Sequence, residues 1–453
     1  MHRTIDCMAE TDAIKAPAST NGEVQSLIRG IVRSLRHRNF QLFFSGQLIS
    51  VIGTWMQNLA QPWLVYELTK SPLLLGLVAF AGQIPVLILA PIGGLVADRW
   101  NRHRVVIATQ TASMILAFIL AALTLLHVVR VWEIVVLATL LGSVNAFDIP
   151  ARQSFIIEMV GREDLMNAIA LNSSMFNGAR VVGPAIAGLL VAWIGEGWCF
   201  FANGASYIAV IVGLLLMKLG PPHQVTREAP PLKHLAEGFR FVRRTKPIFA
   251  LMLQLGVVSV VAVPYTVLMP IFADHILHGG ARALGTLMGA TGIGAVLGAL
   301  TLAAKRGVRG LGRLVAYAAI GFGSSLVAFS FSRNFVLSVV LLVPAGFGFM
   351  LQMASTNTLI QSMVPDDLRG RTMSIYSMMF MGMMPVGSLL AGALASRIGA
   401  PWTVMLGGLG AMIGGFIFWR LLPGMRLEVV QLLKASGIAS ATQAEAVASR
   451  RVR

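Results

Sequence analysis

One fully charged side chain interrupts a long apolar stretch of this sequence. Arg180 lies in the segment NGARVVGPAIAG, within an apolar run over residues 165–194. If the run crosses a membrane, a cation near its middle costs about 3 kcal/mol or more, so water, a polar neighbour or a ligand must compensate it. The sequence offers Asn172, Asn177, water or an anionic ligand as neighbours. An extended reach to Asp148 is the structural alternative, because an arginine side chain extends far along a span.

A second set of polar residues follows the first apolar stretch at steps of three and four, so most of them share one helical face. Amides and hydroxyls are costly against lipid, so this face is predicted to line the bundle interior or a water-filled cavity. Hydrogen bonding between helices is the alternative. The set comprises Gln47, Ser50, Thr54, Gln57, Asn58 and Gln61. Later apolar stretches offer Gln254, Gln352 and Asn357 as partners in a substrate site.

The elements that carry these residues must be membrane helices. The chain is 56% hydrophobic and only 12% charged, with a mean hydropathy of +0.74, whereas soluble domains carry about 25% charged residues. A helical span needs about 20 apolar residues, and twelve such stretches lie between residues 40 and 422. The sequence therefore predicts an all-α integral membrane protein with twelve transmembrane helices.

The charge distribution predicts the orientation. The net charge is +17, but the basic residues gather in alternate connections, as the positive-inside rule requires, so a membrane rather than a nucleic acid is the expected partner. The exceptions are Lys70, Arg130, Arg282, Arg333 and Arg397, which fall on the outer side, and Arg180 within a span. Both termini are then cytoplasmic.

The chain also repeats itself at an offset of 204 residues. VGREDLMNAIALNSSMF and VPDDLRGRTMSIYSMMF begin at Val160 and Val364, and Gly183, Gly188, Gly195 and Trp198 recur as Gly387, Gly392, Gly399 and Trp402. We expect two pseudo-symmetric six-helix bundles, an architecture typical of transporters. The expected divisions are a cytoplasmic segment 1–38, a bundle 39–219, a cytoplasmic connector 220–247, a bundle 248–422 and a cytoplasmic tail 423–453.

A charged loop follows the second apolar stretch, and its sequence is GGLVADRWNRHR. Its Gly94, Asp98, Arg99, Arg102 and Arg104 resemble the signature of the major facilitator superfamily between the second and third helices. The resemblance implies that this cluster pairs across a cytoplasmic gate, with Asp148 as the acid that meets Arg99 or Arg102. The sequence departs from the signature at Asn101, where the family usually has glycine, and at His103.

A narrower resemblance covers most of the spans. The segments FFSGQLISVIGTWMQNLAQPWLVYELTKSPLLLGLV, NAFDIPARQSF and ALNSSMFNGARVVGPAIAG resemble the branch of enterobactin-exporter-like and macrolide-efflux-like proteins. It implies a monomeric exporter of a drug-like or siderophore-like molecule in a bacterial cytoplasmic membrane, coupled to protons. Within NGARVVGPAIAG, a helix-packing role is predicted for Gly178, Gly183, Pro184 and Gly188.

No residues of soluble-enzyme chemistry accompany these features. The sequence has no Gly-rich phosphate loop with Lys-Ser/Thr and no Cys/His cluster at metal-ligand spacing. We therefore expect no catalytic residues, no metal, no cofactor and no enzyme activity. A secondary active exporter working by alternating access is the leading hypothesis. The alternatives are an importer of a small metabolite and a non-transporting polytopic receptor.

Overall fold

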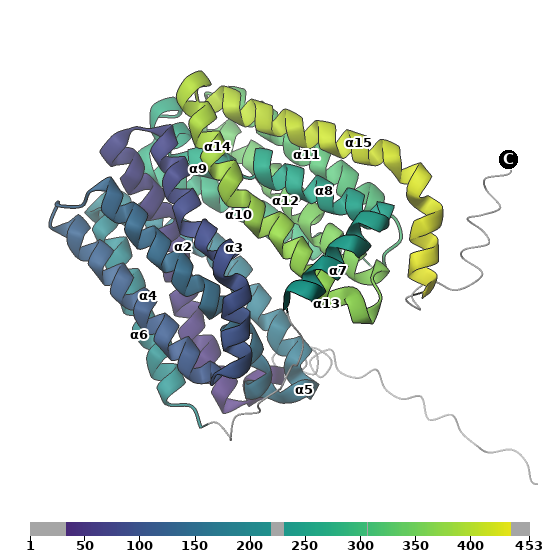
Figure 1. Ribbon diagram of the computed structural model, residues 1–453. Helices are drawn as coiled ribbons and strands as arrows, with labels where there is room; N and C mark the ends of the chain where they lie inside the picture. Colours follow the sequence, from purple (N-terminus) through teal and green to yellow (C-terminus); the bar gives the residue numbers. More distant parts are fainter. Residues whose placement is uncertain (1–32, 219–230, 306, 436–453) are drawn as a thin grey trace, which may run out of the picture.

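The computed structural model describes residues 33–218, 231–305 and 307–435, and the described part is built from helices. Two bundles lie side by side, the first half of the chain in purple through blue to teal and the second in teal through green to yellow (Figure 1). They meet where α5 packs against α10 and where α3 packs against α14. Most of the predicted segment 1–38, part of the predicted connector 220–247 and the end of the predicted tail 423–453 lie outside the described residues.

The first bundle contains five long helical elements. They are α2 (Arg38–Thr69), α3 (Pro72–Arg99), α4 (Arg102–Leu125), α5 (Val131–Ile194) and α6 (Glu196–Leu215), preceded by the 3-10 turn η1 (Arg33–Arg36). Polar caps start two of them: Ser71 accepts from the backbone of Leu74, and Asn101 accepts from that of Arg104. Asn101, the departure from the family's glycine, thus begins α4.

The 64-residue element α5 contains two segments rather than one rod. Gly161 has φ 71° and ψ 179°, a conformation that interrupts a helix and that glycine adopts without a steric penalty. Ile134 and Val191, near the two ends of α5, belong to one buried cluster, so the chain folds back at Gly161.

The second bundle begins after the amphipathic helix α7 (Pro231–Arg244). Its elements are α8 (Lys246–Val261), α9 (Tyr265–Ile271), the π-helical η2 (Phe272–Ile276), α10 (Gly280–Ala304), α11 (Leu311–Phe331), α12 (Phe335–Met363), α13 (Asp366–Ser377), the π-helical η3 (Met378–Gly382), α14 (Met383–Ile398) and α15 (Ala400–Ala435). The last helix therefore continues into the predicted tail, past residue 422.

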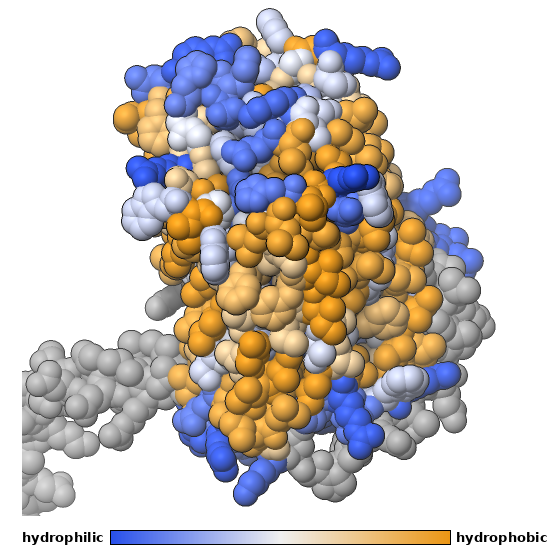
Figure 2. Space-filling view, turned by 90° about the vertical axis from the view of Figure 1, so that its left-hand side faces the viewer, coloured by the Kyte–Doolittle hydropathy of each residue, from blue (hydrophilic) through white to orange (hydrophobic). Residues whose placement is uncertain are grey.

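Ten of the described helical segments are long and apolar enough to cross a membrane. The count takes α5 as one segment and does not include α2, which carries the stripe of polar residues. The number twelve stays a prediction. One face of the molecule has a broad hydrophobic band between two hydrophilic ends, as a membrane-spanning protein requires (Figure 2).

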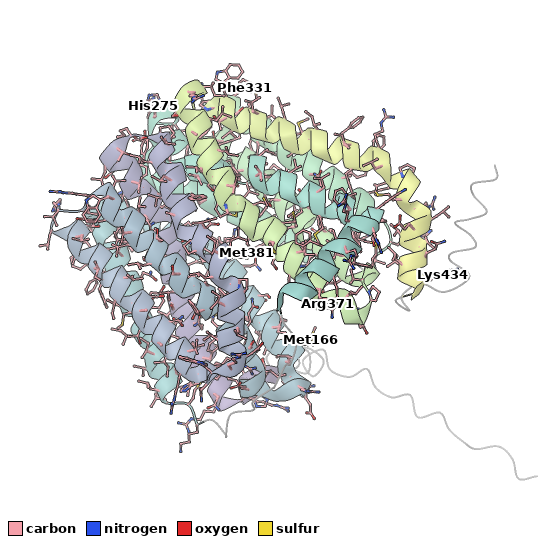
Figure 3. All side chains as sticks on the ribbon, in the orientation of Figure 1. Met166, His275, Phe331, Arg371, Met381 and Lys434 are labelled. Atoms are coloured by element: carbon pink, nitrogen blue, oxygen red, sulfur yellow. The ribbon has the colours of Figure 1, made fainter. Side chains whose placement is uncertain are left out.

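The two ends of the molecule differ in their connections. We call the end with the α3–α4 turn, the fold-back at Gly161, α7 and α13 the basic end, and the other the opposite end. Figure 3 shows Met166 and Arg371 at the basic end and His275 at the opposite end. At the opposite end, Gly195 and Gly399 have φ of 88° and 86°.

The glycines of the sequence repeat make equivalent contacts. A Cβ on Gly183 would lie 2.4 Å from Trp55 of the same bundle, and one on Gly387 would lie 2.3 Å from the carbonyl of Val260. Gly188 approaches α10 across the bundle boundary, as Gly392 approaches α3. Close contacts that only glycine permits therefore recur in both halves. Gly178 has no neighbour within 4 Å of an added Cβ and Pro184 is buried, so Gly183 and Gly188 carry the tight contacts.

Candidate substrate site and gates

Arg180 lies in the second segment of α5, where the two bundles meet. Its backbone carbonyl oxygen would lie 3.2 Å from a Cβ added to Gly292 of α10. Its guanidinium carbon is 5.7 Å from the ring centroid of Trp55 on α2 and 5.7 Å from that of Phe349 on α12. Tyr265 of α9 interacts with it electrostatically. Aromatic side chains from both halves thus surround one cation.

The Arg180 side chain has no ion pair and no hydrogen bond within the described ranges. Asp148 does not reach it, because that carboxylate pairs with Arg152 instead. Each cation–π contact is worth about 0.5–2 kcal/mol, so the two offset much of the roughly 3 kcal/mol cost but leave the N–H donors unused. The donors remain available to water or to an anion.

The aromatic wall on the second half extends beyond Phe349. Phe349 lies 5.7 Å from Phe322 and 6.1 Å from Phe380, and Phe322 lies 6.1 Å from Tyr265, all between ring centroids. These four rings come from α9, α11, α12 and η3. They give the surroundings of Arg180 a large apolar surface of fixed shape.

The polar stripe of α2 is divided between two environments. Gln47 and Ser50 are buried, and Gln47 accepts a hydrogen bond from Arg152 at 3.0 Å. Gln57 is also buried and accepts from Asn203 of α6 at 2.6 Å. This part of the stripe joins helices of the first bundle, which is the alternative that the sequence left open.

The remaining members of the stripe are less enclosed. Thr54 is half-buried and donates to the carbonyl of Ser50 at 3.0 Å. Gln61 is half-buried and accepts from Gln57 at 3.4 Å, while Asn58 is exposed. Asn58 and Gln61 are therefore the stripe members best able to contact a ligand.

Asp148 occupies a closed polar cluster inside the first bundle. Its side chain is buried, and its Oδ1 accepts from Thr109 at 2.8 Å and from Gln110 at 2.9 Å. Its Oδ2 lies 3.4 Å from the Nε of Arg152, whose guanidinium also lies over the ring of Phe176. A carboxylate and a cation are thus held together away from solvent, and either partner alone would be costly there.

The charged loop of the signature does not meet Asp148 in this conformation. Arg102 pairs with Glu158 at 2.7 Å, and both belong to the first bundle. Asp98, Arg99 and Arg104 are exposed. The predicted contact of Asp148 with Arg99 or Arg102 is therefore not formed in this conformation, and a gating role for the cluster stays a prediction.

The three polar residues expected from the second half also lie apart. Gln254 is buried against the 414–415 backbone of α15, where its amide can donate to the carbonyl of Gly414. Gln352 is buried, and neither of its amide atoms has a hydrogen-bond partner in the described part of the chain. Asn357 is half-buried and accepts from Gln361 at 2.5 Å. Their predicted contact with a substrate is not visible in this arrangement.

An ion pair joins the two bundles at the opposite end. Lys70, at the end of α2, pairs with Asp274 of η2 at 3.2 Å, and its ammonium lies 4.3 Å from the ring centroid of Tyr66. Within the described ranges, each of the other ion pairs joins residues of the same half. Among the residues that the structure describes, an ion pair thus connects the two halves at the opposite end and none does so at the basic end.

Comparison with known proteins identifies the family. The model described as "Transmembrane secretion effector", of the major facilitator superfamily, matches residues 30–448. The chain belongs to this family. It is similar to the "Staphyloferrin A transporter" of Staphylococcus aureus (26% identity; 85% of this chain, 97% of that protein), the "Multidrug efflux pump Tap" of Mycolicibacterium fortuitum (28%; 79% and 89%) and the "Enterobactin exporter EntS" of Shigella boydii (27%; 86% and 93%).

Solved structures of transporters share the fold. The nucleoside transporter NupG aligns with a TM-score of 0.66 at 15% identity, covering 86% of this chain and 99% of that chain. A bacterial homologue of ferroportin in an inward-facing state aligns with a TM-score of 0.63 at 14% identity, covering 84% and 98%. The major facilitator fold and the resemblance to its exporter branch, both predicted from the sequence, are confirmed.

Membership in the transmembrane secretion effector family makes the chain a membrane transporter of a small molecule and not an enzyme. No group of three or more His, Cys, Asp or Glu suited to a metal ion occurs in the part of the chain that the structure describes. The sequence interpretation overlooked Trp55, Phe349 and the Lys70–Asp274 pair. Only the pair had a signal in the sequence: its two members are separated by the repeat offset of 204.

Proposed function

We propose that this family member is a secondary active exporter of an amphipathic anion, which it binds at Arg180. The observation that carries the proposal is the unpaired guanidinium of Arg180 between Trp55 of the first half and Phe349 of the second. A ligand bound there contacts both halves at once. Its binding therefore differs between conformations that bring the halves together and those that separate them, as alternating access requires.

The chemistry of the cargo follows from the surroundings. A guanidinium binds carboxylates and other oxyanions through two parallel N–H donors. The rings of Phe349, Phe322 and Phe380 provide an apolar surface beside it. An aromatic acid satisfies both features, whereas a small hydrophilic anion uses only one. The names of the relatives, which refer to siderophores and drugs, agree with such a range of cargo.

The direction of transport is proposed from the charge distribution and the relatives. The positive-inside rule puts the basic end, and with it both termini, in the cytoplasm. The Lys70–Asp274 pair then closes the outer side, and the described conformation is one that takes cargo from the cytoplasm. We call the boundary between the two halves, where α5 meets α10 and α3 meets α14, the seam. We propose that the protein acts as a monomer, since the two halves of one chain form the whole seam.

Transport of two ligands of similar shape that differ in charge tests the site. We expect inverted membrane vesicles to accumulate pyrenebutyrate but not its neutral methyl ester, and right-side-out vesicles to accumulate neither. R180M should fold normally and lose most of the pyrenebutyrate flux. R180K should retain part of it. Each hydrogen bond to a charged group contributes about 1.5–3 kcal/mol, so losing the cation should weaken binding by about 10- to 100-fold.

Arg282 provides the control, because its guanidinium also lies over an indole ring, that of Trp193, at 5.9 Å. It lies at the opposite end of the molecule, away from Trp55 and Phe349, so R282M removes a comparable cation–π contact between the two halves without altering the surroundings of Arg180. Native flux in R180M, or an equal loss in R282M, would contradict the assignment of Arg180. Accumulation only in right-side-out vesicles would instead indicate an importer.

We further propose that Asp148 carries the coupling proton. Four groups face its carboxylate or pair with it: Arg152 on its own helix, Thr109 and Gln110 on α4, and Tyr207 on α6. Protonation of Asp148 would break its pair with Arg152 and release that cation inside the first bundle. The change in charge is large enough to favour a different arrangement of these helices.

The coupling proposal predicts a specific loss. D148N should bind pyrenebutyrate but should no longer accumulate it in response to a pH gradient across inverted vesicles. D366N is the control, because Asp366 is an exposed acid paired with Arg369 at the basic end. If D148N still concentrates pyrenebutyrate when only a pH gradient is applied, the proton is carried elsewhere.

A further inference from the structure

A pocket of about 720 Å³ lies outside the seam, between α7, the start of α8 and the α13–η3 region. Its walls include Phe249 and Met252 of α8 and Ile375 of α13. The helix α7 is held over it by two contacts: Glu237 pairs with Arg371, and Gly238 packs against Ile375. Figure 3 shows Arg371 at the crossing of these helices. The pocket is part of the fold and is distinct from the Arg180 site.

The mouth of this pocket is cationic. Arg240, Arg243 and Arg244 line it at steps of three and four, which put them on one face of α7. All three are exposed and have no ion pair in the described part of the chain. The acid of the same helix, Glu237, already pairs with Arg371. Three unneutralised cations thus converge on one opening.

The interior continues as an apolar groove along α8. A second cavity of about 330 Å³ shares Leu253 and Met379 with the pocket and runs on to Val261 and Met383. Gly256 lines the groove beside Met379, whose sulfur would lie 3.5 Å from an added Cβ, at ordinary contact distance. From residue 253 to residue 261 a helix rises roughly 12 Å, the length of about ten methylene groups. The groove is therefore long enough for much of one acyl chain.

We propose that this pocket and groove bind an anionic phospholipid from the leaflet at the basic end. The three arginines of α7 would hold its phosphate, and the groove between α8 and the α13–η3 region would hold an acyl chain. Charge complementarity identifies this occupant, because basic pockets beside membrane helices select anionic headgroups. Leu253 is 54% exposed and Phe249 is 46% exposed, as expected for side chains that contact lipid.

The position of the groove connects this lipid to the transport site. η3 forms part of the groove through Met379, and its Phe380 ring lies 6.1 Å from Phe349, which contacts Arg180. Gly382 of η3 lies against Leu87 of α3 in the other half. A lipid chain seated on Met379 therefore supports the π-helical segment that contacts both halves.

Lipid binding to the purified full-length chain tests the proposal without any transport measurement. Native mass spectrometry should show retention of dioleoyl-phosphatidylglycerol over dioleoyl-phosphatidylcholine. Each cation near a membrane surface contributes about fivefold to affinity, so R240Q/R243Q/R244Q should weaken phosphatidylglycerol retention by about 100-fold. The control R309Q/R313Q/R426Q removes three exposed arginines of the same half and should retain the lipid.

A second variant separates the groove from the charged mouth. V257W fills the groove from its exposed side and should abolish the preference for dioleoyl- over dihexanoyl-phosphatidylglycerol, while the preference for an anionic headgroup remains. Equal loss in both triple variants would show non-specific attraction and overturn the site. Displacement of the lipid by glycerol 3-phosphate would also overturn it, because the mouth would then be a simple anion site. The proposal would also be overturned if both R240Q/R243Q/R244Q and V257W retained the lipid as the native chain does.

Discussion

The ion pair between Lys70 and Asp274 should set the balance between the two conformations of the transporter. The two side chains are 58% and 37% exposed, and such pairs contribute about 0.2–1 kcal/mol. The contact of Lys70 with the Tyr66 ring lies at the end of α2, so D274N leaves it in place. D274N should therefore destabilise the closed opposite end by up to about 1 kcal/mol, which raises the fraction open at that end up to about fivefold.

Spin labels at Val128 and Val336 can report this shift, since both are exposed at the opposite end and they belong to different halves. Double electron–electron resonance in nanodiscs should show a larger long-distance population in D274N and K70Q. The charge swap K70D/D274K should restore the native distribution. High salt should act like the substitutions, because the pair is exposed. An unchanged distribution in D274N, or a swap that behaves worse than either single variant, would refute the role of the pair.

Three further predictions concern other sites. D98N should favour the state open at the basic end, measured as faster labelling of a cysteine at position 166, and unchanged labelling would remove Asp98 from the gate. G188A should cost about 1–3 kcal/mol of stability, because its Cβ would lie 2.9 Å from α10, while G178A should be neutral in the same thermal unfolding assay. The pKa of Asp164 is lowered from 3.8 to about 2, chiefly by its hydrogen bond with His37, so the attachment of η1 is complete above pH about 4 and weakens as the pH falls toward 2. Hydrogen exchange of residues 33–36 should show this pH dependence in the native chain and not in D164N.

The fold could be predicted because its signals are local or periodic. Apolar stretches, positive-inside charges and the offset of 204 residues each follow from membrane physics acting on one helix or one half. The structure adds that Gly195 and Gly399 share a left-handed backbone conformation, as the repeat implied. The fold-back at Gly161 follows the same logic, because the sequence predicts a new span over residues 165–194 after the acidic pair Glu163 and Asp164. The structure adds the positive φ of Gly161, at which the chain turns.

The site was harder to predict because its members come from different helices. Arg180 was identified from its cost in a span, but nothing in the sequence links it to Trp55 or Phe349, which reach it from α2 and α12. Asp148 was assigned to arginines of the charged loop, yet Arg152, one turn away, holds it in this conformation. In a transporter, the residue that pairs with a gate residue also changes between conformations, and the sequence alone does not specify which conformation holds a given pair.

The two halves share a scaffold but divide the chemistry between them. The repeat offset relates three charged residues of the first half to neutral residues of the second. Asp148 corresponds to Gln352, Arg152 to Thr356 and Arg180 to Met384. The second half instead contributes most of the aromatic wall around Arg180. If both halves carried the charges, cargo and proton would have two equivalent sites and no defined order of binding. We propose that the charged half holds cargo and proton while the aromatic half closes over them. Conformational change then depends on whether cargo neutralises Arg180 and whether the carboxylate of Asp148 still compensates Arg152, because an uncompensated charge disfavours the closed, dehydrated seam.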